Sequence, residues 1–340
     1  MSSRPPCTKL STRTRRPGVS IGSHVALAAL AAAGLLGCGD GSGASGDATP
    51  AVDSAADLSG GAAWRRAPQP QAVSLLGDTL YASALPPDAL ADRLARLAEA
   101  RAAYEEDPDD PDAIIWLGRR LAYLGQYREA IDVYGEGIEN HPEEPRLYRH
   151  RGHRLITTRR LDRAVEDLER AAALIEGTED EVEPDGLPNA RGIPTSTLHS
   201  NVWYHLGLAR YLQGDFEGAL EAYRRCLDVS RNPDMLVATA NWLYMTLRRL
   251  GRDAEAARVL EPITADLDVI ENDSYHRLLL LYRGDATPES LWEDESEALG
   301  NATVGYGVGN WHLYNGRTDE AEGAFRRVLE TREWAAFGYL

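Results

Sequence analysis

Residues 203–227 read WYHLGLARYLQGDFEGALEAYRRCL, and the order of large and small residues in this stretch decides the fold. Gly207 and Ala219 place small side chains where two packed helices must approach closely, and Tyr223 supplies a large group for the packed face. Gly214 lies between the two helical patterns, and glycine adopts the positive φ that ends a helix at little cost. The stretch therefore predicts two antiparallel helices packed as a pair.

The same arrangement recurs along the chain at close to 34 positions. Gly125 holds the turn position of an earlier copy, and 34 positions later Arg159 replaces the turn glycine in a copy that keeps Gly152 and Ala164. After Gly214 the turn positions are Gly251, Gly284 and Gly316, at intervals of 37, 33 and 32 residues. Because one pair cannot bury its own apolar face, this recurrence predicts a stack of pairs.

These residues resemble the tetratricopeptide repeat, a 34-residue helix-turn-helix unit of the form W-x2-L-G followed by A-x3-F. The resemblance covers residues 111–340 and implies an all-α, right-handed superhelix whose concave side binds a partner. We expect helix pairs at about 111–144, 145–176, 200–232, 237–268, 271–299 and 302–332. We also expect an extended arm at 65–86, a capping helix at 87–106 that starts the 87–340 superhelix, an insertion at 176–197, and one more helix beginning in 334–340.

The first residues resemble a bacterial lipoprotein signal peptide at 1–37. Five basic residues fall within the first 16 positions, and the apolar run Val25 to Leu36 leads into Gly37-Cys38. That run is too short to span a bilayer, which suits a removable segment. The resemblance implies that Cys38 carries the lipid, with a plain secretory signal as the alternative. Residues 38–64, rich in Gly, Ser, Ala and Asp, are expected to form a disordered tether.

Charge and composition exclude several classes of function. The chain of 340 residues has a net charge of −17, and loss of the five basic residues of the signal leaves −22 and no lysine. Such a chain repels nucleic acid, so no nucleic-acid partner is expected. Without lysine or a nucleophile motif, we expect no catalytic residue and no cofactor. Cys226 is expected to be a buried small residue.

Residues 146–160 carry six arginines and no acid, against the overall charge. His150 and His153 are three positions apart, but the arginines around them repel a cation, so no metal site is expected. In the repeat register the first helix of each pair lines the concave groove, where arginine, tyrosine and asparagine suit an anionic peptide. The expected groove contacts are Arg119, Tyr123, Arg149, His153, Tyr204, Tyr211, Asn241, Arg248, Tyr306 and Asn310.

Two alternatives to ligand binding stay open for these arginines. They can form a solvated helix face paired with acidic helices nearby. The insertion, acidic over 176–185, can instead fold over the groove and satisfy the arginines itself.

The sequence therefore predicts a lipoprotein of the bacterial cell envelope, held in a membrane by its lipid and binding a protein or peptide. The outer membrane, facing the periplasm, is favoured over the inner membrane. Two other functions remain as alternatives: a structural subunit of a larger envelope complex, and an enzyme with an unrecognised site near 176–197.

Overall fold

The computed structural model describes residues 69–292 and 298–340, and the side chains of residues 298–301 lie outside the description. The predicted signal peptide, the lipid-bearing Cys38 and the tether therefore lie outside the described residues. Among the residues described, no helix is long and apolar enough to cross a membrane.

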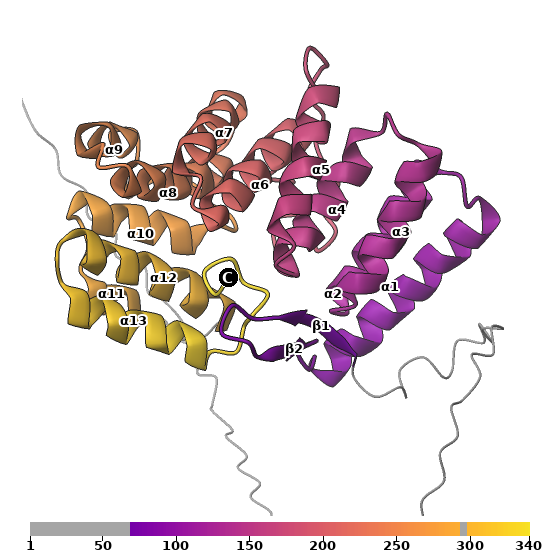
Figure 1. Cartoon of the computed structure of the whole chain (residues 1–340), viewed down its shortest axis with the longest axis horizontal. Coiled ribbons are helices and arrows are strands. Elements are labelled where there is room, and N and C mark those ends of the chain that lie inside the picture. Colours follow the sequence, from indigo (N-terminus) through magenta and orange to yellow (C-terminus); the bar gives the residue numbers. More distant parts are fainter. Residues whose placement is uncertain (1–68, 293–297) are drawn as a thin grey trace, which may run out of the picture. The chain divides into compact units, whose positions relative to one another are not determined.

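The described chain consists of a short β-hairpin followed by helices, and the predicted all-α repeat fold is confirmed (Figure 1). After α1, the helices form pairs whose two members contact each other. The elements are β1 (Pro70–Val73), β2 (Thr79–Tyr81), α1 (Pro87–Glu106), α2 (Pro111–Tyr123), α3 (Tyr127–Asn140), α4 (Pro145–Thr157), α5 (Leu161–Leu174), α6 (Leu198–Gln213), α7 (Phe216–Val229), α8 (Pro233–Arg249), α9 (Asp253–Val259), α10 (Asp273–Arg283), α11 (Pro288–Trp292), α12 (Ala298–Tyr314) and α13 (Thr318–Glu330).

Local sequence explains where these helices begin and end. Asp110 accepts hydrogen bonds from the first backbone N–H groups of α2, and Asn232 does the same for α8. Thr197 and Ser200 form a reciprocal capping box at the start of α6. Gly214 then ends α6 with a φ of +80°.

Glycines set the spacing within the pairs. A Cβ added at Gly207 would lie 2.7 Å from the ring of Tyr223, and one added at Gly152 would lie 2.7 Å from Leu168 Cγ. Both distances are shorter than carbon atoms allow, so only glycine permits these approaches. The main core runs from Ile131 to Ala324 through successive pairs.

The structure differs from the sequence expectations at four places. Part of the expected extended arm is the antiparallel hairpin β1–β2. The fourth pair starts at Pro233 rather than 237, because Asn232 caps α8. The second helix of the fourth pair, α9, has only seven residues. Residues 334–340 form turns and no helix.

Replacement of Ala219 tests the packing of the pairs. Ala219 is fully buried in the α6–α7 pair, so Ala219→Leu should lower the free energy of unfolding by about 1–3 kcal/mol. Gly323 is the control, because it lies within α13 with open space around it, and Gly323→Ala should stabilise by about 0.5–1 kcal/mol. Chemical denaturation measures both, and an unchanged midpoint for Ala219→Leu would contradict this packing.

Candidate functional site

Basic side chains from three helices meet on the inner side of the first repeats. We call Arg119 of α2, Arg149, His150, His153 and Arg154 of α4, and His205 of α6 the basic cluster. The rings of His153 and His205 lie 4.2 Å apart. Arg149, His150 and His205 are buried. The register predicted Arg119, Arg149 and His153, whereas His150, Arg154 and His205 were missed as members of this site.

The insertion contributes the acid that faces this cluster. Arg149 Nη2 lies 3.1 Å from Glu183 Oε1, and both side chains are 9% exposed. The second oxygen of Glu183 accepts a hydrogen bond from Asn201 Nδ2 at 2.7 Å. A bridge between Val182 and Thr197 holds the two ends of the insertion together. Both alternatives left open by the sequence are therefore found: the insertion pairs with Arg149, and acidic residues of neighbouring helices pair with Arg146 and Arg151.

The insertion also covers two side chains of α2. Arg120 Nη1 donates to the carbonyl of Gly186 at 2.8 Å, and a Cβ added at Gly186 would collide with Tyr123. Only glycine allows the insertion backbone to lie this close to α2. Tyr123, a predicted groove contact, thus faces the insertion.

His150 is held in its neutral form. Arg149 Nη1 lies 2.9 Å from His150 Nδ1, and because a guanidinium only donates, Nδ1 accepts and Nε2 carries the proton. Nε2 lies 3.4 Å from Glu183 Oε1. Burial, reinforced by the charge of Arg149, holds the pKa of His150 well below its usual value, and burial does the same to the pKa of His205.

Two arginines of the cluster, Arg119 and Arg154, pair with aromatic groups instead of carboxylates. Arg119 contacts the hydroxyl of Tyr123 at 3.3 Å and lies over the ring of Trp116, and Arg154 lies over the ring of Tyr127. Within residues 69–292 and 298–340, neither guanidinium forms an ion pair. The cluster therefore holds three arginines against Glu183 alone, which leaves it positively charged.

A cavity of about 340 Å³ opens beside this positive charge. His153 and Arg154 of α4, Asn272 and Ser274 at the start of α10, and Phe337 are among the residues that line it, and one carboxylate, that of Glu271, lines it as well. Glu271 accepts hydrogen bonds from Asn189 and Thr195 of the insertion and forms no ion pair with Arg154, so the guanidinium of Arg154 can pair with an anionic group that enters the cavity.

Most of the remaining predicted groove contacts bond to side chains of the array itself, and Tyr306 also lines a cavity of about 260 Å³ beside the hairpin. Tyr204 donates to the hydroxyl of Tyr275 at 3.2 Å, Tyr306 donates to that of Tyr211 at 3.3 Å, and Arg248 pairs with Asp253 at 2.8 Å. Because the first helices of the later pairs meet one another, their aromatic rings fill the space between them. The predicted contacts buried there are Tyr204, Tyr211, Asn241 and Asn310, while Tyr306 is half-buried.

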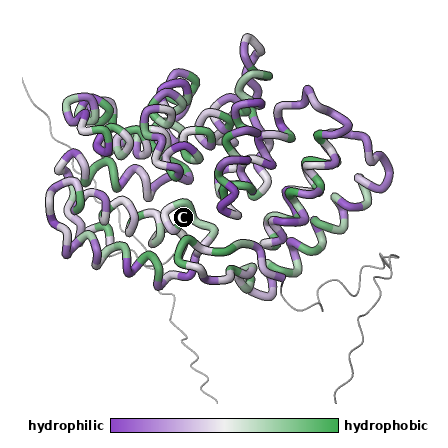
Figure 2. The backbone as a smooth tube through the Cα atoms, in the orientation of Figure 1, coloured by the Kyte–Doolittle hydropathy of each residue, from purple (hydrophilic) through white to green (hydrophobic). Residues whose placement is uncertain are grey.

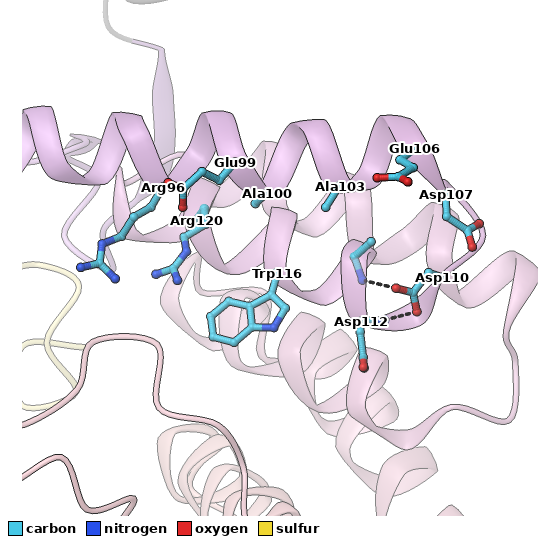
Figure 3. A pocket seen from close by; sticks show the side chains of 11 residues that line it. Arg96, Glu99, Ala100, Ala103, Glu106, Asp107, Asp110, Asp112, Trp116 and Arg120 are labelled. Atoms are coloured by element: carbon cyan, nitrogen blue, oxygen red, sulfur yellow. Dashed lines mark hydrogen bonds between the residues drawn. The ribbon is translucent and has the colours of Figure 1, made fainter.

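A larger cavity, of about 710 Å³, lies between α1 and α2 (Figure 3). Arg96 and Arg120 lie at one end beside Trp116, and acidic side chains lie at the other. The described residues contain no group of three or more His, Cys, Asp or Glu able to hold a metal ion. Cys226 is fully buried, and burial raises the pKa of its thiol to about 12, so it is a poor nucleophile.

Comparison with known proteins identifies the repeats. Residues 115–180 and 200–233 match two family models, both described as tetratricopeptide repeat. The heat-shock cognate co-chaperone sgt12 of Aspergillus fumigatus is 28% identical over 143 residues, which cover 42% of this chain and 35% of that protein. The chain thus matches about a third of the length of this relative.

Solved structures similar to this chain include two repeat proteins. YrrB, described as having an unusual peptide-binding site, is 14% identical, with 70% of this chain and 95% of that chain covered and a TM-score of 0.39. A tetratricopeptide repeat protein from Parabacteroides merdae is 15% identical, with 74% and 94% covered and a TM-score of 0.45.

The neutral histidines predict a loss of stability in mild acid. Their pKa values are lowered by folding, so below about pH 6.5 the unfolded chain binds protons that the folded chain does not. The free energy of unfolding should therefore fall as the pH drops from 6.5 to 5, by up to about 1.4 kcal/mol per pH unit for each histidine. His150→Gln keeps an acceptor for Arg149 and should make this slope shallower. Chemical denaturation at several pH values measures the change of the unfolding free energy with pH. The same change in the unaltered chain and in His150→Gln would contradict a neutral, buried His150.

Proposed function

Because this chain is a tetratricopeptide repeat protein, we propose that it is an adaptor that binds a protein or peptide and catalyses no reaction itself. Stacked helix pairs offer extended surfaces for such binding. The conclusion rests most on one observation: Arg154 forms no ion pair in the described chain and lines a cavity of about 340 Å³.

The ligand group that fits this site is a carboxylate of an acidic partner segment. A guanidinium offers paired N–H donors that match the two oxygens of a carboxylate, and such charge-assisted hydrogen bonds are stronger than neutral ones. Arg154 lines the cavity directly, whereas Arg149 already contacts Glu183. Arg154 is therefore the residue expected to bind the partner, and Arg149 the residue that holds the insertion in place.

We further propose that the adaptor is a lipoprotein of the bacterial cell envelope, anchored through Cys38 and facing the periplasm from the outer membrane. The basic start, the apolar run and Leu-Leu-Gly-Cys support this location. A mature chain of charge −22 is repelled by anionic lipid headgroups, so attachment to a membrane needs a lipid anchor.

A second candidate, a permanent subunit of a larger complex, is favoured by one apolar surface. Val73, Leu75 and Leu76 of the hairpin are 57%, 76% and 72% exposed. Leu75 and Leu76 border a cavity of about 260 Å³ together with Leu329. Exposed apolar groups in such a number are typical of surfaces that another protein covers.

Binding of an acidic peptide tests the adaptor proposal. Arg154→Gln should weaken binding of a fluorescent Asp- and Glu-rich peptide by about tenfold or more, and binding of the unaltered chain should weaken as salt rises. Arg163→Gln, which removes the same charge from an exposed position of α5, is the matched control. Fluorescence anisotropy measures the affinity for the peptide. Equal affinities of Arg154→Gln and Arg163→Gln would show that Arg154 does not bind it.

Fractionation of cells tests the anchor. Cys38→Ser should release the protein from the membrane fraction, because several acyl chains supply roughly 0.8 kcal/mol for each buried CH₂. Mass spectrometry of the unaltered protein should show the mass of the lipid. Unchanged membrane retention together with an unchanged mass would show that Cys38 carries no lipid.

A further inference from the structure

Trp334 is buried in a site that its own helix pair does not build. Its indole Nε1 donates to the carbonyl of Tyr81 at 2.6 Å, across 253 positions of sequence. The ring meets the edge of Tyr127 at 5.5 Å and packs against Ala72 and Leu80 of the hairpin. The side chain is only 5% exposed. In Figure 2 the hairpin and the last residues carry hydrophobic stretches.

Arg159 contacts the same residue from the turn between α4 and α5. It donates to the carbonyl of Trp334 at 2.7 Å and lies over its ring, with the guanidinium carbon 5.2 Å from the centroid. Arg159 has a φ of +61°, a backbone conformation that residues other than glycine rarely adopt. The corresponding turns of other repeats have glycines with positive φ: Gly125, Gly214, Gly251, Gly284 and Gly316. A strained residue at a contact of this kind points to a function for the contact.

Phe337 occupies a second part of the site. Its ring lies 5.4 Å from that of His153, 5.9 Å from that of His205 and 6.4 Å from that of Tyr204. A Cβ added at Gly338 would collide with the carbonyl of Ala302, so the backbone approaches α12 where only glycine fits. Two tight turns, from Glu333 to Ala336 and from Ala336 to Tyr339, shape the segment.

These contacts are those of a bound peptide. Trp334 and Phe337 are held by residues far away in sequence: the hairpin, Tyr127 of α3, Arg159 and histidines of α4 and α6. Ala336, between them, packs on Ala302 and Val328 of the preceding pair α12–α13. The short link from α13 includes Arg332, a second residue other than glycine with positive φ, at +58°. The chain thus turns sharply out of α13 and places Trp334 and Phe337 among residues of the hairpin, α3, α4 and α6.

We propose that this site binds a partner segment presenting Trp and Phe three positions apart, and that residues 334–340 fill it as an internal ligand. The site consists of Ala72, Leu80, Tyr127, His153, Arg159 and His205. Phe337 also closes one side of the cavity beside Arg154, so a partner that displaces the segment opens the basic cluster. The inference rests on the proposed function in that the chain binds protein segments, but it does not depend on an acidic partner or on the lipid anchor.

Because the 334–340 segment is joined to α13 by a short link, it competes strongly with any free peptide for the site. A segment joined by a short link acts at an effective concentration in the millimolar range, so a free peptide at micromolar concentration does not displace it. Weakening the internal segment should therefore make the site available to the same sequence added as a peptide.

Peptide binding to the full chain tests the site. The probe is a fluorescein-labelled peptide of residues 333–340, EWAAFGYL, and its control has alanine in place of both Trp and Phe. The chain with Trp334→Ala and Phe337→Ala should bind the probe at least tenfold more tightly than the unaltered chain does, and should not bind the control peptide. The proposal is overturned if the folded double variant does not bind the probe, or binds the probe and the control peptide equally. This outcome is independent of whether the acidic peptide binds at Arg154.

Hydrogen exchange tests the role of Arg159 without removing the aromatic residues. Arg159→Gly suits the backbone of the turn and removes the contact with Trp334, so the melting temperature should hold or rise while exchange of the 334–340 amides speeds up at least tenfold. Arg163→Gln, which removes the same charge from an exposed position of α5 away from the segment, is the control and should leave that exchange unchanged. Equal exchange in the two variants overturns the proposal. Dimerisation of Arg159→Gly alone would also overturn it, because a second copy would then be the occupant.

Discussion

In four of the pairs the two helices come into close contact where one of them lacks a side chain, and the arrangement of this array depends on that constraint. This close approach fixes the rotation of each helix. It therefore decides which residues lie between the two helices, which contact the next pair and which lie on the inner face of the array. The glycine and the large residue that meet are Gly118 and Tyr134, Gly152 and Leu168, Gly207 and Tyr223, and Gly309 and Phe325. The positions of the basic side chains on α2, α4 and α6 follow from these contacts.

The charge of the inner face runs against that of the chain. The chain is acidic, yet among the residues described only Glu183 forms an ion pair with an arginine of the basic cluster. Arg119 and Arg154 are half-buried and unpaired, so each loses part of its hydration without gaining an ion pair. Such an arrangement is better explained by binding than by stability, as perturbed charges gather at functional sites.

The pairs could be predicted from sequence because their packing contacts lie about 16 residues apart, within one repeat. Gly207 and Tyr223 show this. The contacts of Glu183 with Arg149, and of Arg159 with Trp334, could not, since no short window contains both partners. Residues 334–340 have a helical spacing of apolar residues, but the site that receives Trp334 and Phe337 overrides that local preference. The inward direction of Tyr211 and Tyr306 followed from the register, whereas their mutual contact depends on how several pairs stack together.

The bond from Trp334 to Tyr81 also bears on how the array melts. A linear stack of repeats frays from its two free ends, because a terminal repeat has only one neighbour. Here the hairpin before α1 and the 334–340 segment after α13 hold each other, so α1–α3 and α12–α13 do not open independently. Closing a loop of this length costs only slightly more entropy than closing a shorter one, since the cost grows with the logarithm of length. The contact between the hairpin and residues 334–340 therefore makes the helix pairs unfold together instead of one after another.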